Sequence, residues 1–172
     1  ISALAEESGY DVTDTYRLPD DEKLLKEKIA RAMKTSDLVV VSGGSSQGEK
    51  DATAKVIDEL ASRGLLTHGL AIKPGKPTII GYDDNYGTLL LGLPGHPVSA
   101  IMVFRIILGW LKSLLSPGYS DFPVEAAIDR NIPGAPGKDT LQMVKLIDKD
   151  GKYIARPVFG KSGNIIKLAA AD

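Results

Sequence analysis

Apolar positions in the longer, first part of the chain alternate between helical spacing and short continuous runs. Between residues 22 and 34, Leu25, Ile29 and Met33 repeat at helical spacing, while lysine and arginine residues occupy the other face. Leu38–Val41 is a Val-rich run of the kind that is buried on both faces of a parallel sheet. Further strands are expected at residues 11–16, 70–72, 78–81 and 88–93, and further helices at residues 1–8, 52–62 and 98–114. Because strands and helices alternate, the predicted fold class is α/β, a three-layer sandwich with a mostly parallel sheet.

The pattern changes after Ser116–Tyr119, and no convincing helix follows. We expect strands at residues 124–128, 140–147 and 153–158, the last two joined by a hairpin turn at Asp150–Gly151. The chain is therefore divided into an α/β domain, residues 1–117, and a small all-β domain, residues 118–172. So small a unit has little core of its own and should lean on the first domain or on a partner. Since the first domain opens inside a helix, we also expect that its first strand has been lost by trimming at the N-terminus.

Composition excludes several classes of protein. The 43% of hydrophobic and 25% of charged residues favour a folded core, and the 21 basic residues against 22 acidic ones give no charge argument for nucleic acid or an acidic membrane. With no cysteine and only 2 histidines, any bound metal is expected to have oxygen ligands. The longest apolar stretch is broken by Arg105 and Lys112, and no signal peptide is visible, so we expect no membrane span and a cytoplasmic location.

Two loops follow predicted strands and precede predicted helices, which places them at the ligand-binding edge of an α/β sheet. The first, residues 42–51, is rich in small residues whose free N–H groups favour an anion, although its polar residues could equally cap the helix. The second, residues 94–99, is stiffened by Pro94 and Pro97, and Pro97 suits the first turn of a helix. His96 could face a ligand there, but a turn-filling role is the preferred interpretation.

Two further features bear charge. Lys73 and Lys76 lie on the rigid segment Lys73–Pro77 and could grip phosphate, although exposed lysines beside a Pro-Gly bend are common. Asp20 and Asp51 each precede a helix and could meet at the crevice, where carboxylates suit Mg²⁺ together with phosphates. By spacing alone, a plain N-cap after Pro19 is the preferred role for Asp20.

Three segments together resemble a known family. Ser42–Asp51, Ala71–Pro77 and Gly92–Ala100 resemble, in order and spacing, the signature series of the MoeA and gephyrin E-domain family, the molybdopterin molybdenumtransferases. Ala155–Val158, followed by Ser162–Gly163, resembles that family's small C-terminal β-domain. His96 stands where the family commonly has Asn. The family's first strand, its Thr-Gly-Asp-Glu loop and its two N-terminal domains are absent from these residues.

The resemblance implies an enzyme of molybdenum cofactor biosynthesis that takes adenylylated molybdopterin and molybdate, releases AMP and leaves molybdenum on the pterin's sulfurs, supported by Mg²⁺. It implies a fold like the stand-alone molybdopterin-binding proteins, and a homodimer in the full-length protein. Asp20 and Asp51 are the implied catalytic residues and magnesium ligands. The implied substrate-binding residues are Gly43, Gly44, Ser45, Ser46, Gly48, Glu49, Lys73, Gly75, Lys76, Pro94, Gly95, His96, Pro97 and Ser99.

Two other functions remain open from the sequence. One is a molybdopterin adenylyltransferase of the stand-alone family, although stand-alone members lack the C-terminal β-unit. The other is a scaffold that retains the fold for oligomer contacts, with the apolar helix at residues 98–114 and its Trp110 as a plausible interface. The piece itself could also bind ligand without turnover.

Overall fold

A computed structural model describes residues 1–43, 49–116, 118 and 124–159 of the 172-residue chain, with the side chains of residues 49–51 left out. Its centre is a four-stranded sheet in the order β1 (Leu38–Ser42), β5 (Thr88–Leu93), β4 (Ile79–Asp83) and β2 (Leu65–His68). β1 and β5 are parallel, whereas β4 is antiparallel to both β5 and β2. The predicted α/β class is confirmed, but the sheet is mixed and not mostly parallel, because only one of its three described pairings is parallel.

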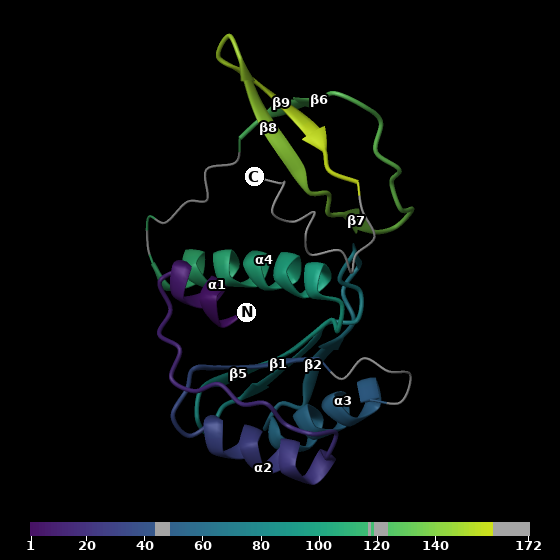
Figure 1. Ribbon diagram of the computed structural model, residues 1–172. Helices are drawn as coiled ribbons and strands as arrows, with labels where there is room; N and C mark the ends of the chain where they lie inside the picture. Colours follow the sequence, from purple (N-terminus) through teal and green to yellow (C-terminus); the bar gives the residue numbers. More distant parts are fainter. Residues whose placement is uncertain (44–48, 117, 119–123, 160–172) are drawn as a thin grey trace.

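Helices cover both faces of this sheet (Figure 1), as the three-layer prediction requires. α1 (Ser2–Glu7) and α4 (Pro97–Leu115) lie on one face, and α2 (Glu22–Ala32) and α3 (Glu49–Leu60) lie on the other. The neighbouring residues Leu90 and Leu91 of β5 are 1% and 0% exposed and belong to opposite apolar clusters. Burial on both faces explains why this strand is a continuous apolar run without polar alternation.

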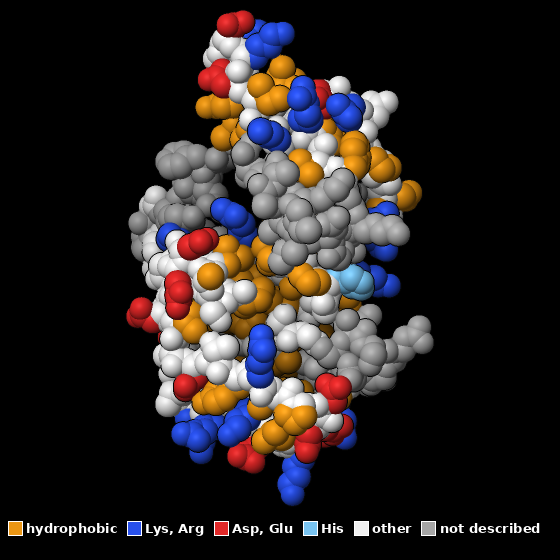
Figure 2. Space-filling view, viewed as in Figure 1, with side chains coloured by type: hydrophobic (Ala, Val, Ile, Leu, Met, Phe, Trp, Pro, Cys, Tyr) orange, Lys and Arg blue, Asp and Glu red, His pale blue; other side chains and the backbone are white. Residues whose placement is uncertain are grey.

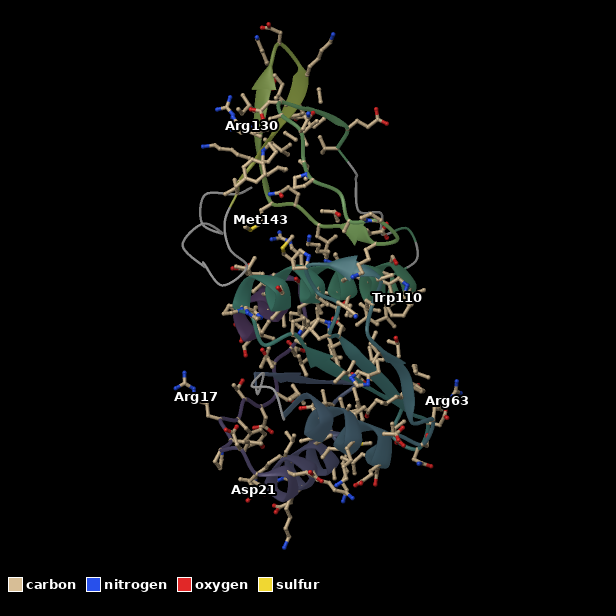
Figure 3. The ribbon with its side chains drawn as sticks, turned by 90° about the vertical axis from the view of Figure 1, so that its right-hand side faces the viewer. Arg17, Asp21, Arg63, Trp110, Arg130 and Met143 are labelled. Atoms are coloured by element: carbon tan, nitrogen blue, oxygen red, sulfur yellow. The ribbon has the colours of Figure 1, made fainter. Side chains whose placement is uncertain are left out.

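α4 is the main apolar helix of the molecule. Val103, Phe104 and Leu108 lie on its buried side, against the sheet. By length and composition α4 could cross a membrane, but the core helices of soluble proteins pass the same test, and such a helix is weak evidence of a span. Ile106, Trp110 and Leu114 form an exposed apolar row one helical turn apart. Figure 3 labels Trp110 on this helix.

The strand predicted at residues 11–16 is not formed, and this prediction is wrong. Val12 packs against the cluster under α4, but no backbone hydrogen bond joins residues 11–16 to another strand within the described part of the chain. A strand is stabilised by its ladder, so a segment with strand-like composition stays irregular where no neighbouring strand pairs with it. No strand was expected at β2, and β3 (Ile72–Lys73) begins later than the strand expected at residues 70–72.

The C-terminal part contains strands in its described residues, as predicted. β6 (Ala126–Ile128), β9 (Lys152–Pro157) and β8 (Val144–Lys149) form a three-stranded sheet in that order. Asp150 and Gly151, with φ values of 55° and 78°, make the predicted hairpin turn between β8 and β9. The strand expected at residues 140–147 is divided, because β7 (Asp139–Thr140) leaves this sheet to pair with β3.

Arg156, in the segment that resembles the family's β-domain, forms an ion pair with Asp129. Its Nε donates to Asp129 Oδ2 at 2.7 Å, and Arg130 Nε donates to Asp129 Oδ1 at 3.2 Å. The hydrogen bond from Arg156, with that from Arg130, holds the pKa of the Asp129 carboxyl below its usual value despite partial burial. This cluster joins β9 to the residue that follows β6.

The side chain of Asp83 stabilises the turn between β4 and β5 through hydrogen bonds. This side chain is 1% exposed and accepts hydrogen bonds from Tyr86 N at 2.9 Å, Ser62 N at 3.0 Å and Asn85 Nδ2 at 3.2 Å. Burial alone raises the pKa of this carboxyl, but these hydrogen bonds outweigh it, and the pKa lies below its usual value.

We expect Asp83→Asn to lower stability at neutral pH and to make the stability less dependent on pH. The folded-state pKa of Asp83 is depressed, so its contribution is present above the unfolded-state pKa and is lost as the pH falls through the folded value. Urea unfolding from about pH 2 to about pH 7 measures this, and the difference from the unsubstituted chain should shrink in acid. The exposed Asp37→Asn is the control, and parallel pH curves for the Asp83 variant and the unsubstituted chain would contradict the expectation.

Candidate functional site

Strand register brings three loops to one edge of the sheet. Ser42, the last residue of β1, pairs with Leu93, the last residue of β5. Ile79, the first residue of β4, pairs with Gly92. The loop after β1 therefore starts at this edge, and the proline loop (Pro94–Pro97) and the lysine loop (Lys73–Pro77) lie at it, where α/β sheets bind ligands.

The loop after β1 is described only at its two ends. Gly43 is exposed and has a φ of +115°, a conformation that favours glycine. Gly44, Ser45, Ser46 and Gly48 lie outside the described residues. α3 begins at Glu49, a few residues earlier than predicted, so Glu49 and Asp51 belong to its first turn. The helix N-terminus thus follows the loop directly, which suits either an anion or a capping role.

The lysine loop combines a tightly packed glycine with exposed charges. The Lys73–Pro74 peptide bond is cis, and Gly75 is buried with a φ of +120°. A Cβ at Gly75 would lie 2.5 Å from Val103 Cγ2 and 2.8 Å from Ile72 Cδ1, so a side chain does not fit there. Lys73 and Lys76 both remain exposed on either side of this glycine. The structure thus presents two ammonium groups from one constrained segment.

The proline loop leads directly into α4. Pro94 is buried, Gly95 is half-buried, and His96 and Pro97 are exposed. Pro97 occupies the first turn of α4, as predicted, and His96 is the extended N-cap residue, with no hydrogen bond from its side chain to the cap. Ser99 lies in the first turn and is 5% exposed. The N-terminus of a long helix and a nearby serine therefore lie at this edge.

Of the two predicted carboxylates, the structure describes the side chain of Asp20 but not that of Asp51. Asp21, and not Asp20, caps α2, because its Oδ1 accepts from Leu24 N at 2.9 Å. The preferred N-cap role for Asp20 is therefore wrong, and Asp20 is exposed beside the cap. The side chain of Asp51 lies outside the described residues. Figure 3 labels Asp21 at the α2 end of the molecule.

Ion pairs show how α2 and α3 are aligned. Lys55 Nζ lies 2.6 Å from Glu22 Oε1, and Lys26 Nζ lies 2.6 Å from Glu59 Oε2. The hydrogen bond with Lys26 holds the pKa of Glu59 below its usual value, and the one with Glu22 holds the pKa of Lys55 above it. Because residue numbers rise together in both pairs, the helices run parallel, and their N-termini lie on the same side. Asp20, just before the cap of α2, and Asp51, in the first turn of α3, therefore belong to the same end of neighbouring helices.

A metal centre built from protein side chains alone is not found among the described residues, which contain no group of three or more His, Cys, Asp or Glu suited to a metal. Over α2 and α3, Figure 2 shows both acidic and basic side chains.

Sequence reasoning missed two contributors to the site. β7 pairs with β3, and Leu141 N donates to Lys73 O at 2.8 Å, so the β-domain holds the lysine loop. Thr78, directly after the loop, is fully buried, and its hydroxyl donates to Gly75 O at 2.7 Å. The first contact joins segments far apart in the chain and leaves no local signal, whereas a threonine beside a Pro-Gly bend was a visible cue.

The fold and this edge define an α/β ligand-binding protein with a small β-domain attached. The family model described as "Probable molybdopterin binding domain" matches residues 1–113, and the model "MoeA C-terminal region (domain IV)" matches residues 125–172. The chain therefore belongs to the MoeA-type molybdopterin-binding family.

Named relatives agree with this assignment. A molybdopterin molybdenumtransferase of Haemophilus influenzae is 38% identical over 104 residues, 60% of this chain and 25% of the relative. One from Nostoc is 28% identical over 178 residues, covering 100% of this chain and 41% of the relative. The crystal structure of a molybdopterin biosynthesis MoeA protein from Pyrococcus horikosii matches with a TM-score of 0.73 and 31% identity over 99% of this chain and 40% of that one. The chain thus spans about two fifths of the relatives that it matches along its whole length.

We expect Gly75→Ala to destabilise the protein more than Gly43→Ala does. The two glycines have similar positive φ values, but a Cβ at Gly43 meets nothing within 4 Å, whereas one at Gly75 meets Val103 and Ile72. Backbone strain alone predicts a loss of about 1–3 kcal/mol at Gly43, and overpacking should add a further 1–3 kcal/mol or so at Gly75. Urea unfolding measures both, and equal losses would show that the lysine loop is not tightly packed.

Proposed function

We propose that this chain is the molybdopterin-binding and C-terminal portion of a molybdenumtransferase of molybdenum cofactor biosynthesis. The proposed substrates are adenylylated molybdopterin and molybdate, and the proposed reaction cleaves the phosphoanhydride, releases AMP and leaves molybdenum on the pterin's sulfurs. The observation that carries the proposal is that the lysine loop and the proline loop lie at one sheet edge, where the loop after β1 also starts. Family membership and the names of the relatives support it.

Charge explains how this edge would bind its substrates. Molybdopterin has a phosphate tail, and its adenylylated form and molybdate are also anions. Lys73 and Lys76 supply positive charge, while the N-terminus of α4, with Ser99 in its first turn, supplies donors. The constrained glycine and proline residues keep these groups in place before the ligand arrives, which lowers the entropy cost of binding.

Asp20 and Asp51 are the residues that we assign to Mg²⁺, with phosphate oxygens completing its ligands. The parallel arrangement of α2 and α3, which places their N-termini on the same side, supports this assignment. When bound, Mg²⁺ would neutralise charge on the departing AMP. The chain's own part in the reaction is then to hold the two phosphates between the lysine loop and these carboxylates.

The C-terminal β-domain favours the transferase over the stand-alone adenylyltransferase, because residues 125–172 match the MoeA C-terminal region. A cytoplasmic location belongs to the same proposal. So does a homodimer of the full-length protein, for which the exposed row of Ile106, Trp110 and Leu114 offers one apolar surface. Sedimentation of the full-length protein and of its Trp110→Lys variant tests the dimer.

Lys73→Ala should weaken molybdopterin binding about tenfold, since a hydrogen bond to a charged group is worth about 1.5–3 kcal/mol and this lysine is exposed. Isothermal titration of the 172-residue chain with molybdopterin measures the effect. Lys34→Ala is the matched control, because Lys34 is exposed just after α2, near the opposite edge of the sheet. No saturable heat with the unsubstituted chain, or equal affinities for both variants, would remove the proposal.

Asp51→Ala in the full-length protein should abolish molybdenum insertion while molybdopterin still binds. The substitution removes a proposed magnesium ligand but leaves the lysine loop unchanged. Turnover of adenylylated molybdopterin with molybdate, followed through AMP release, measures the effect, and Asp58→Ala on the same helix is the control. Full activity of the Asp51 variant would show that this residue acts only at the start of the helix.

A further inference from the structure

Thr78 is the residue through which the lysine loop is joined to the sheet. It is 0% exposed and lies between Pro77 and the first residue of β4. Its Oγ1 donates to Gly75 O at 2.7 Å, and its N–H donates to Lys76 O at 2.9 Å. Its own carbonyl oxygen accepts from Gly69 N at 2.8 Å. A single buried residue thus makes contact with two consecutive carbonyl groups of the loop.

The backbone carbonyl groups of the two lysines accept hydrogen bonds from different parts of the molecule. The Lys73 carbonyl accepts from Leu141 N at 2.8 Å, so this end of the loop is fixed by the β-domain. The Lys76 carbonyl accepts from Leu70 N and Thr78 N, both at 2.9 Å. The Gly75 carbonyl between them accepts the Thr78 hydroxyl. The Thr78 side chain therefore sets the backbone that joins the two lysines.

We propose that Thr78 is a positioning residue for anion binding, whose hydroxyl fixes the Gly75 carbonyl and so the relative placement of Lys73 and Lys76. This inference rests on the proposed function, because it concerns the same loop. Thr78 is buried behind the loop and acts through the two lysines, not on the ligand itself. Two cations that are already placed bind a diphosphate without a further cost of ordering the loop.

Valine has nearly the shape of threonine but cannot donate a hydrogen bond, so Thr78→Val separates the hydroxyl from the packing. In that variant the Gly75 carbonyl loses its buried donor, and the loop should relax. A net loss of one hydrogen bond corresponds to binding that is about threefold to tenfold weaker. Thr78→Ser retains the hydroxyl and should restore the affinity.

Thr88→Val is a closely matched control. Thr88 is also 0% exposed, and its hydroxyl donates to two backbone carbonyls, Met33 O at 2.9 Å and Ser36 O at 3.0 Å. It pairs with Asp83 at the start of β5, which is the opposite edge of the sheet. The same substitution in a similar environment therefore tests whether any buried threonine has this effect.

The experiment titrates inorganic pyrophosphate into the 172-residue chain at low ionic strength and compares Thr78→Val, Thr78→Ser, Thr88→Val and Lys73→Ala. We expect weaker binding for Thr78→Val and Lys73→Ala, and unchanged binding for Thr78→Ser and Thr88→Val. Hydrogen exchange of the Leu70 amide, which donates to Lys76 O, should be faster in Thr78→Val and unchanged in Thr88→Val. If the valine variant fails to fold, the pair Thr78→Ser and Thr78→Ala, which differ by the hydroxyl alone, gives the same comparison.

The outcomes distinguish this inference from the proposed function. If Lys73→Ala weakens pyrophosphate binding and Thr78→Val does not, the positioning role is overturned while the lysine site stands. Equal weakening by Thr78→Val and Thr88→Val would also overturn it, because the effect would then be one of stability alone. If the unsubstituted chain binds no pyrophosphate, or Lys73→Ala binds it equally well, both the proposed site and this inference fail.

Discussion

Leu90 and Leu91 are consecutive residues of β5, yet they are buried in the two opposite apolar clusters of the molecule. Both faces of such a strand must be covered, and α4 covers one side while the pair α2 and α3 covers the other. Because β1 runs parallel to β5, both strands deliver their following loops to the same edge. The position of the candidate site is thus a consequence of how the central strand is buried.

The lysine loop extends this arrangement to the second part of the molecule. β3 and β7 pair over only two residues each, but their pairing joins the α/β unit to the C-terminal strands next to Lys73. Gly75, in the middle of the loop, lies against Val103 of α4 and Ile72 of β3. Packing from the core helix and hydrogen bonding from the β-domain therefore meet at one short segment that bears two exposed cations.

The pattern of residues predicted those features of the fold that depend on neighbouring residues alone. The apolar run of β5, the spacing of Leu25 and Ile29 and the position of Pro97 each follow from burial or from backbone geometry, and the structure agrees with them. Predictions from the sequence were wrong or missing where a structural feature depends on a segment that is distant in the chain. Residues 11–16 have a strand-like pattern but no ladder, and nothing near Lys73 signals that β7 will pair beside it. Asp20 and Asp21 are adjacent in the sequence. The residue at which the helix begins decides which of the two carboxylates reaches Leu24 N.

The contact between Leu141 N and Lys73 O also has a thermodynamic consequence. A ligand that binds only the ordered lysine loop stabilises the conformations in which that loop is ordered. In these conformations β3 and β7 are paired. Part of the binding free energy would then appear as resistance of the C-terminal strands to local opening, far from any atom that the ligand touches. The small β-domain would be most stable while the site is occupied, and release of the ligand would loosen both units together.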